Sequence, residues 1–291
     1  MNELMEVAEF PARRMWQLFE PYHAITYFAP ECRGSFKDAG LRGFWMGYFA
    51  GRAAPMGAVG PGVVTATFYN FAPAMVGRSV PDAWSFASVT QVLDARLEGA
   101  DLALRRILGD RAESSEVGRA ADLAESAVQD TDRCGRPLFA ANSDLRVPDE
   151  PHLRLWWALT CLREHRGDGH VAALVHAGID GCEAHVTLAA SRAIPRSTLQ
   201  PNRGWTDEEW AHASDRLRSR GWVDDGERLT SAGRTAREQL ERDTDRMAEE
   251  PWRRLGQDRT EQLADMLAPL TAAIVSSGVI PVLNPIGLRP S

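Results

Sequence analysis

The chain has 291 residues, of which 25% are charged and 44% hydrophobic, and its formal net charge is -7. This composition is typical of a globular protein and leaves room for two domains, while the negative charge disfavours nucleic acid and anionic membranes as partners. No unbroken apolar run reaches the roughly 20 residues of a membrane-spanning helix, so we expect no membrane partner.

The N-terminus and the cysteines indicate a compartment. The first residues, MNELMEVAEFPARR, lack the basic and apolar regions of a secretory signal. The four cysteines are widely spaced and form no CxxC motif. A chain of this size needs no disulfide bonds for stability, so we expect a cytoplasmic protein with free thiols.

The first half of the chain contains two strongly apolar segments. Residues 43–51 carry glycines four residues apart, which clear one face of a helix for a close neighbour, and residues 63–76 have no charged side chain. Uncharged aromatic helices either pack in the core or line an apolar pocket, and both interpretations stay open. For the pocket, we predict ligand contacts from Tyr22, Trp45, Met46, Tyr48, Tyr69 and Asn70.

Two histidines are candidates for chemistry. His23 and His170 each begin an apolar run that has a helical pattern, and Asp168 is a candidate N-cap for the second run. The dipole at a helix N-terminus lowers the pKa of a histidine, which leaves a neutral base that Glu20 or Asp168 would orient. Packing at a helix start is the alternative.

A proline-bounded stretch divides the chain. Residues 137–151 begin and end with proline and contain further turn-forming residues. We therefore predict an N-terminal half (residues 1–136), a linker (137–151) and a C-terminal half (152–291).

The C-terminal half shows clear local signals. Residues 208–220 have the apolar spacing of a helix, and Thr206 with Glu209 forms a capping-box pattern. An Asp-Gly turn between two short apolar runs predicts a β hairpin over residues 221–230.

Short matches recur in the same order in the two halves. Ala39–Gly43 resembles Ala177–Gly181, Arg52–Pro55 resembles Arg192–Pro195, and Arg105–Arg111 resembles Arg253–Arg259. The common order indicates two degenerate copies of one helical unit, although a chain rich in arginine and alanine also produces such matches by chance.

The order of elements from Trp205 to Arg246 resembles the recognition helix, wing and C-terminal helix of MarR-type winged-helix regulators. The similarity rests on a helix that ends in RGWV, a hairpin, and the run LTSAGR at the start of a long helix. Runs such as FEPYHA (19–24) also resemble an actinobacterial helix-turn-helix-like family. The resemblance implies a mainly α fold of tandem degenerate winged-helix halves with a small β wing, as a monomeric pseudo-dimer or a homodimer.

The resemblance also implies DNA binding, but the residues at the expected contact positions do not have the positive charges that DNA binding requires. The expected recognition helix begins with three carboxylates, at residues 207–209, where phosphates would lie, and its arginines come only at the far end. The uncharged segment 63–76 occupies the corresponding place in the first half. We therefore expect that DNA binding is lost, with a MarR-like regulator that binds DNA through its C-terminal half as the alternative.

The remaining motifs limit the chemistry. Arg52 and Arg192 are candidates to anchor a carboxylate or phosphate, or to pair with Asp38 and Asp180. The histidines between residues 165 and 185 lack the spacing of a helical zinc site, and no motif identifies a cofactor. We predict a protein that holds a small, largely apolar or aromatic molecule between its halves, with histidine-based chemistry. A module whose long helices bind a partner protein is a third interpretation.

Overall fold

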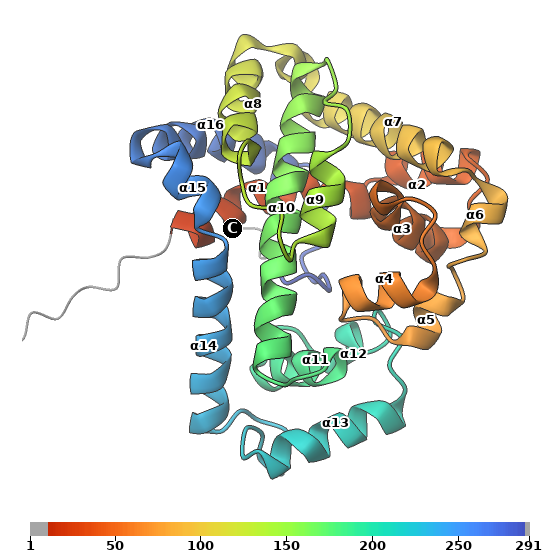
Figure 1. Cartoon of the computed structure of the whole chain (residues 1–291), viewed down its shortest axis with the longest axis vertical. Coiled ribbons are helices and arrows are strands. Elements are labelled where there is room, and N and C mark those ends of the chain that lie inside the picture. Colours follow the sequence, from red (N-terminus) through yellow and green to blue (C-terminus); the bar gives the residue numbers. More distant parts are fainter. Residues whose placement is uncertain (1–10, 289–291) are drawn as a thin grey trace, which may run out of the picture.

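The computed structural model describes residues 11–288, which form a mainly helical molecule (Figure 1). The mainly α prediction is confirmed. The elements are α1 (Pro11–Phe28), α2 (Pro30–Asp38), α3 (Gly43–Ala53), η1 (Ala54–Met56), α4 (Pro61–Phe68), α5 (Pro73–Gly77), α6 (Ala83–Phe86), α7 (Val89–Leu108), η2 (Gly109–Glu113), α8 (Ser115–Val128), α9 (Pro137–Ser143), α10 (Pro151–His176), α11 (Gly181–Ala190), α12 (Arg196–Leu199), α13 (Asp207–Ser219), α14 (Ser231–Met247), α15 (Glu250–Leu255) and α16 (Gln257–Ser276).

Helix α10 is the central element of the fold (Figure 1). It packs against α8 near its N-terminus, against α9 along its middle, against α14 near its C-terminus, and against α1. Its buried residues point in every direction, because neighbours surround it. A helix covered on all sides needs apolar residues around its whole circumference, which is why α10 lacks a single apolar stripe.

The packing of the long helices is reciprocal. Helix α1 packs against α16, and α10 packs against α8, so the last long helix of each half lies on the first helix of the other half. Helices α2 and α7 pair in the first half, as α10 and α14 do in the second. The largest hydrophobic cluster lies where these helices meet and contains residues from both halves.

Local signals place several helix starts. Thr206 and Glu209 form the predicted capping box at the start of α13, and Asp180 with Glu183 forms another at α11. The predicted β wing is represented by one antiparallel bridge between Val223 and Leu229, and no longer strand occurs within residues 11–288. The Asp-Gly turn forms as expected, but the paired segments are too short for a ladder.

Three positional predictions differ from the structure. Asp168 and His170 lie inside α10, and His23 lies inside α1, so none of them is at a helix start. Gly169 does not interrupt α10, because the absence of its Cβ admits Arg136 and Met247, whose nearest atoms would lie 2.7 and 3.2 Å from that Cβ. The cost of a helical glycine is thus offset by close tertiary packing.

The stretch predicted as a linker contains α9. The side chains of Leu138 and Phe139 in this helix are buried, and α9 packs against α10. Asp168 accepts a hydrogen bond from the Phe139 backbone amide over 2.9 Å, which fixes the start of α9 on the central helix.

The uncharged segment 63–76 forms α4 and α5, and the loop between them contacts the C-terminal half. The Tyr69 hydroxyl donates to the Ile179 carbonyl over 2.5 Å, and the Ala72 amide donates to the Arg203 carbonyl over 2.8 Å. A Cβ on Gly181 would overlap the Tyr69 carbonyl oxygen, so only glycine permits this approach. The segment therefore joins the two halves.

Candidate functional site

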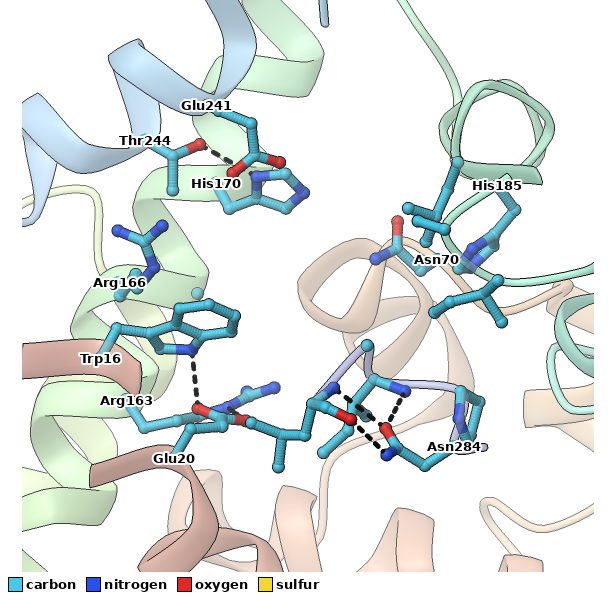
Figure 2. A pocket seen from close by; sticks show the side chains of 18 of the residues that line it. Trp16, Glu20, Asn70, Arg163, Arg166, His170, His185, Glu241, Thr244 and Asn284 are labelled. Atoms are coloured by element: carbon cyan, nitrogen blue, oxygen red, sulfur yellow. Dashed lines mark hydrogen bonds and ion pairs between the residues drawn. The ribbon is translucent and has the colours of Figure 1, made fainter. Parts of the chain in front are cut away.

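A cavity of about 500 Å³ lies between the halves (Figure 2). Its walls come from α1, α10, α11 and α14, the loop after α4, and the C-terminal segment 282–288. This volume is within the usual range for small-molecule sites. The polar side chains that line it are Arg13, Glu20, Asn70, Arg163, Arg166, His170, His185, Arg203, Arg237, Glu241, Thr244 and Asn284.

Four of the five arginines in the wall have carboxylate partners. Arg13 contacts Asp245 and Glu241, Arg166 Nη1 lies 2.7 Å from Asp245, Arg163 contacts Glu20 and Glu164, and Arg237 lies 3.5 Å from Glu241. The pairs of Arg13 join α1 to α14, the Arg163–Glu20 pair joins α10 to α1, and the Arg166–Asp245 pair joins α10 to α14, so these contacts stabilise the wall itself.

Arg203 is the exception. Its side chain is 7% exposed, and no carboxylate among residues 11–288 forms an ion pair with it. Its Nη atoms donate to the carbonyls of Asn202 and Pro285 over 3.1 and 2.8 Å, its guanidinium lies 4.7 Å from the Phe71 ring centre, and its Nε finds no partner within the described chain. Burial lowers the pKa of Arg203, as expected for a cation without a counter-charge.

His170 projects from α10 into the cavity, opposite Asn70 and His185 (Figure 2). Its Nδ1 lies 3.0 Å from the Thr244 hydroxyl, which donates its own proton to the Leu240 carbonyl. With the Thr244 proton directed to Leu240, we assign the imidazole proton to Nδ1, which leaves the Nε2 lone pair as an acceptor. Burial, with several arginines nearby, lowers the pKa of His170 to about 4, so the ring is a neutral acceptor at neutral pH.

His185 and Asn70 form the opposite wall. His185 is 4% exposed, and its Nε2 has no hydrogen-bond partner within the described residues. Burial and the charge of Arg203 hold the pKa of His185 well below its usual range. The side-chain oxygen of Asn70 also lacks a partner in residues 11–288. Buried polar atoms of this kind are rare in folded proteins, and three of them, counting Arg203 Nε, belong to residues that line one cavity.

The C-terminal segment closes one side of the cavity. Asn284 is 2% exposed and accepts hydrogen bonds from the backbone amides of Ile286 and Leu288, while its own amide donates to the Pro281 and Leu288 carbonyls. One asparagine thus organises the turn that carries the apolar side chains of this wall.

The helices below the cavity form a compact three-helix unit. The end of α10, α11 and α13 share one hydrophobic cluster with Val223 and Leu229 of the bridge and Leu240 of α14. Trp210, Ala213 and Leu217 supply the inner face of α13, which is the predicted apolar face of that helix. A helix, a turn and a second helix, followed by a bridged turn, constitute a helix-turn-helix arrangement.

A helix-turn-helix family model matches residues 12–281. The chain belongs to this helix-turn-helix family. It matched no curated protein and no solved structure. The family match covers the three-helix unit and the cavity wall except for its C-terminal segment, residues 282–288.

The outer face of α13 does not present the free positive charges that contacts to DNA phosphates require. Its first turn exposes three carboxylates, and the arginines at its other end bind the protein itself. Arg216 contacts Asp180 over 2.5 Å, Arg218 contacts Asp215, and Arg220 donates to the carbonyls that end α10.

His23 lies elsewhere, in the contact between α1 and α10. Its Nδ1 is 2.9 Å from the Thr160 hydroxyl and its Nε2 is 2.7 Å from the Tyr27 hydroxyl, and it is 1% exposed. Burial, rather than a helix dipole, lowers the pKa of His23. Both ring nitrogens are occupied, so Glu20 does not orient this imidazole; it accepts from Trp16 and Arg163 instead.

Of the predicted ligand contacts, only Asn70 lines the main cavity, together with His170. Tyr48 lines a second, smaller cavity of about 210 Å³ between α1, α2 and α3. Tyr22 and Met46 are buried in clusters, Trp45 packs against Phe49 and Phe71, and Tyr69 belongs to the contact between the halves. The Phe36 ring fills the space left by Gly47 and Gly51 of α3, which agrees with the core interpretation for these two glycines.

The residues predicted to anchor a ligand or to orient His170 do not lie together in one site. Arg52 pairs with Glu164 over 3.0 Å rather than with Asp38, and Arg192 is exposed. Asp168 binds α9 rather than His170, and burial raises its pKa to about 7.

Arg203 and His185 carry no local signal that marks them in the sequence. The crowding of histidines from 165 to 185 includes both cavity histidines, but pattern alone does not tell which of them are satisfied. No cluster of histidine, cysteine, aspartate and glutamate within residues 11–288 has the make-up of a metal site. In the same range, no helix is long and apolar enough to cross a membrane.

Proposed function

We propose that this helix-turn-helix protein binds a small molecule in the cavity between its two halves and no longer binds DNA. The observation that carries the proposal is that Arg203, His185 and Asn70 all line this cavity and that each has a buried polar atom without a partner in residues 11–288. Leaving such groups unsatisfied costs about 1–3 kcal/mol each, a cost that a bound ligand would remove.

The two halves are tandem copies of one winged-helix unit in this proposal. The reciprocal packing of α1 on α16 and of α10 on α8 supports it, because a two-fold related pair of identical units would exchange these contacts. The chain then serves as its own dimer, and the cavity lies between the copies. A homodimer remains the alternative assembly.

His170 is the candidate base in this site. Its free Nε2 and its low pKa keep it ready to accept a proton from a ligand. His23 has no such free nitrogen and acts as a packing residue in this proposal.

A MarR-like regulator that binds DNA through α13 is the second candidate, and family membership favours it. Electrophoretic mobility shift at low salt with promoter-containing DNA separates the two functions. We expect no retardation, because the exposed first turn of α13 would place carboxylates beside phosphates. Retardation that weakens steeply with salt would establish the regulator instead.

Filling the cavity tests ligand binding directly. Gly167 lines the cavity from α10, and Gly167→Leu projects a side chain into it. The matched control is Gly118→Leu in α8, where a Cβ meets open space away from the cavity. We expect benzoate, octanoate, benzyl alcohol or octanol to raise the melting temperature of the wild type and the control, but not of Gly167→Leu. An equal rise in all three proteins, or none in the wild type, would refute the proposal.

A further inference from the structure

We infer that the cavity recognises an organic acid, whose carboxylate pairs with Arg203 and whose hydroxyl or amine groups donate hydrogen bonds to His170, His185 and Asn70. This inference rests on the proposed function and names the class of ligand. It depends on the charges and orphan atoms of the cavity wall rather than on the cavity's volume.

Arg203 supplies the anion site. A buried guanidinium without a counter-charge is costly, and the other arginines of the wall all have carboxylates within the protein. No carboxylate within residues 11–288 forms an ion pair with Arg203. The positive charges of Arg52 and Arg163 lower the pKa of Arg203, as burial does. We therefore assign the counter-charge of Arg203 to a ligand anion.

The guanidinium is held ready for such an anion. Two backbone carbonyls bind its Nη atoms, and the Phe71 ring lies against its face. These contacts fix the plane of the group before a ligand arrives, so little side-chain entropy is lost on binding. The Nε–H has no acceptor within residues 11–288, and Arg203 lines the cavity, so we assign a carboxylate oxygen of the ligand as its acceptor.

The orphan acceptors define the rest of the ligand. The neutral Nε2 of His170 and the side-chain oxygen of Asn70 are hydrogen-bond acceptors, and neither has a donor within residues 11–288. Hydroxyl or amine groups on the ligand would satisfy them. Leu188, Ile194 and Ile286 line the same cavity and would cover a short apolar body.

A carboxylate fits this site better than a phosphate ester. A phosphate ester carries nearly two negative charges and three strong acceptor oxygens. The other four arginines of the wall already form ion pairs with carboxylates of the protein. Only the guanidinium of Arg203 is left to pair with a ligand, and it carries a single positive charge.

Thermal shift and titration calorimetry with matched probes test the inference. The probes are benzoate, para-hydroxybenzoate, benzyl alcohol and phenyl phosphate. We expect para-hydroxybenzoate to bind the wild type most tightly, benzoate next, and the other two at least about tenfold more weakly. This comparison needs no variant. Equal binding of benzyl alcohol, or tighter binding of phenyl phosphate, would overturn the inference while leaving the proposed function in place.

Two variants locate the anion site. Arg203→Met should weaken para-hydroxybenzoate about 10- to 100-fold and should not lower the melting temperature of the free protein, because an unpaired buried charge is removed. Arg96→Met is the control, since Arg96 is equally buried but does not line the cavity, and its affinity for the probe should stay at the wild-type value. Unchanged acid binding by Arg203→Met would refute the assignment. If no probe of any kind binds the wild type, the proposed function itself fails.

Discussion

Two neighbouring regions of this molecule bury charged and polar side chains, and they differ in whether those groups have partners. Between α1, α3 and α10, Glu164 binds both Arg52 and Arg163, and His23 uses both ring nitrogens. In the cavity wall, Arg203, His185 and Asn70 keep polar atoms without partners in the described chain. Burial alone therefore does not mark a functional group. The unsatisfied region points to a ligand, and the satisfied region explains stability.

The largest expected effect is in the satisfied region. Burial raises the pKa of Glu164, but Arg163 and Arg52 outweigh it and hold that pKa well below its usual range. Glu164→Gln leaves two buried cations without their anion, so we expect a loss of about 3–5 kcal/mol in the free energy of urea unfolding. Glu113→Gln, in an exposed pair with Arg105, should cost less than about 1 kcal/mol. Similar losses for both variants would break the comparison.

Asp168 offers a test by pH. Burial raises its pKa to about 7 from an ordinary value near 3.8, so the folded protein binds more protons than the unfolded chain between these values. The contribution of Asp168 to the free energy of unfolding of the wild type therefore decreases as the pH rises from about 4 to 7. Asp168→Asn cannot titrate, so we expect its stability relative to wild type to increase across this range, on the order of 3 kcal/mol in total. A difference that does not change with pH would contradict the assigned environment.

The two histidines sharpen the contrast. His23→Leu leaves the buried hydroxyls of Tyr27 and Thr160 without a partner, and we expect about 2 kcal/mol of destabilisation by urea unfolding. His170→Leu should cost less than about 1 kcal/mol, because Thr244 still donates to Leu240. The effects on ligand affinity should be reversed: His170→Leu should weaken the binding of para-hydroxybenzoate, and His23→Leu should leave it unchanged. Equal stability losses would show that the cavity histidine is also structural.

The smallest effect concerns the contact that holds the halves together. Gly181→Ala forces a methyl group against the Tyr69 carbonyl, and we expect a loss of about 1–2 kcal/mol by thermal or urea unfolding. Gly118→Ala, also in a helix but with open space at its Cβ, should be neutral or stabilising. If Gly181→Ala were as harmless as this control, the loop after α4 would not be tightly docked.

Local signals in the sequence were sufficient for much of the fold. The capping box at Thr206 and Glu209, the apolar face of α13 and its acidic first turn are where the patterns predict them. These features depend on residues within one or two helical turns, so the chain's own order determines them. The pattern failed at residues 168–170, because a Gly-Asp-Gly run that ordinarily ends a helix is held inside α10 by its neighbours.

The candidate site depended on contacts between distant parts of the chain. His170 and Asn70 were predictable as polar residues next to apolar runs, whereas Arg203 became notable only because the folded chain places it in the cavity wall with no carboxylate partner within residues 11–288. The sequence by itself determined a helical, helix-turn-helix chain with an acid-faced α13, since capping and periodicity act locally. Tertiary structure alone decided which buried charges are paired, because pairing is set by which side chains meet after α1, α10 and α14 pack together.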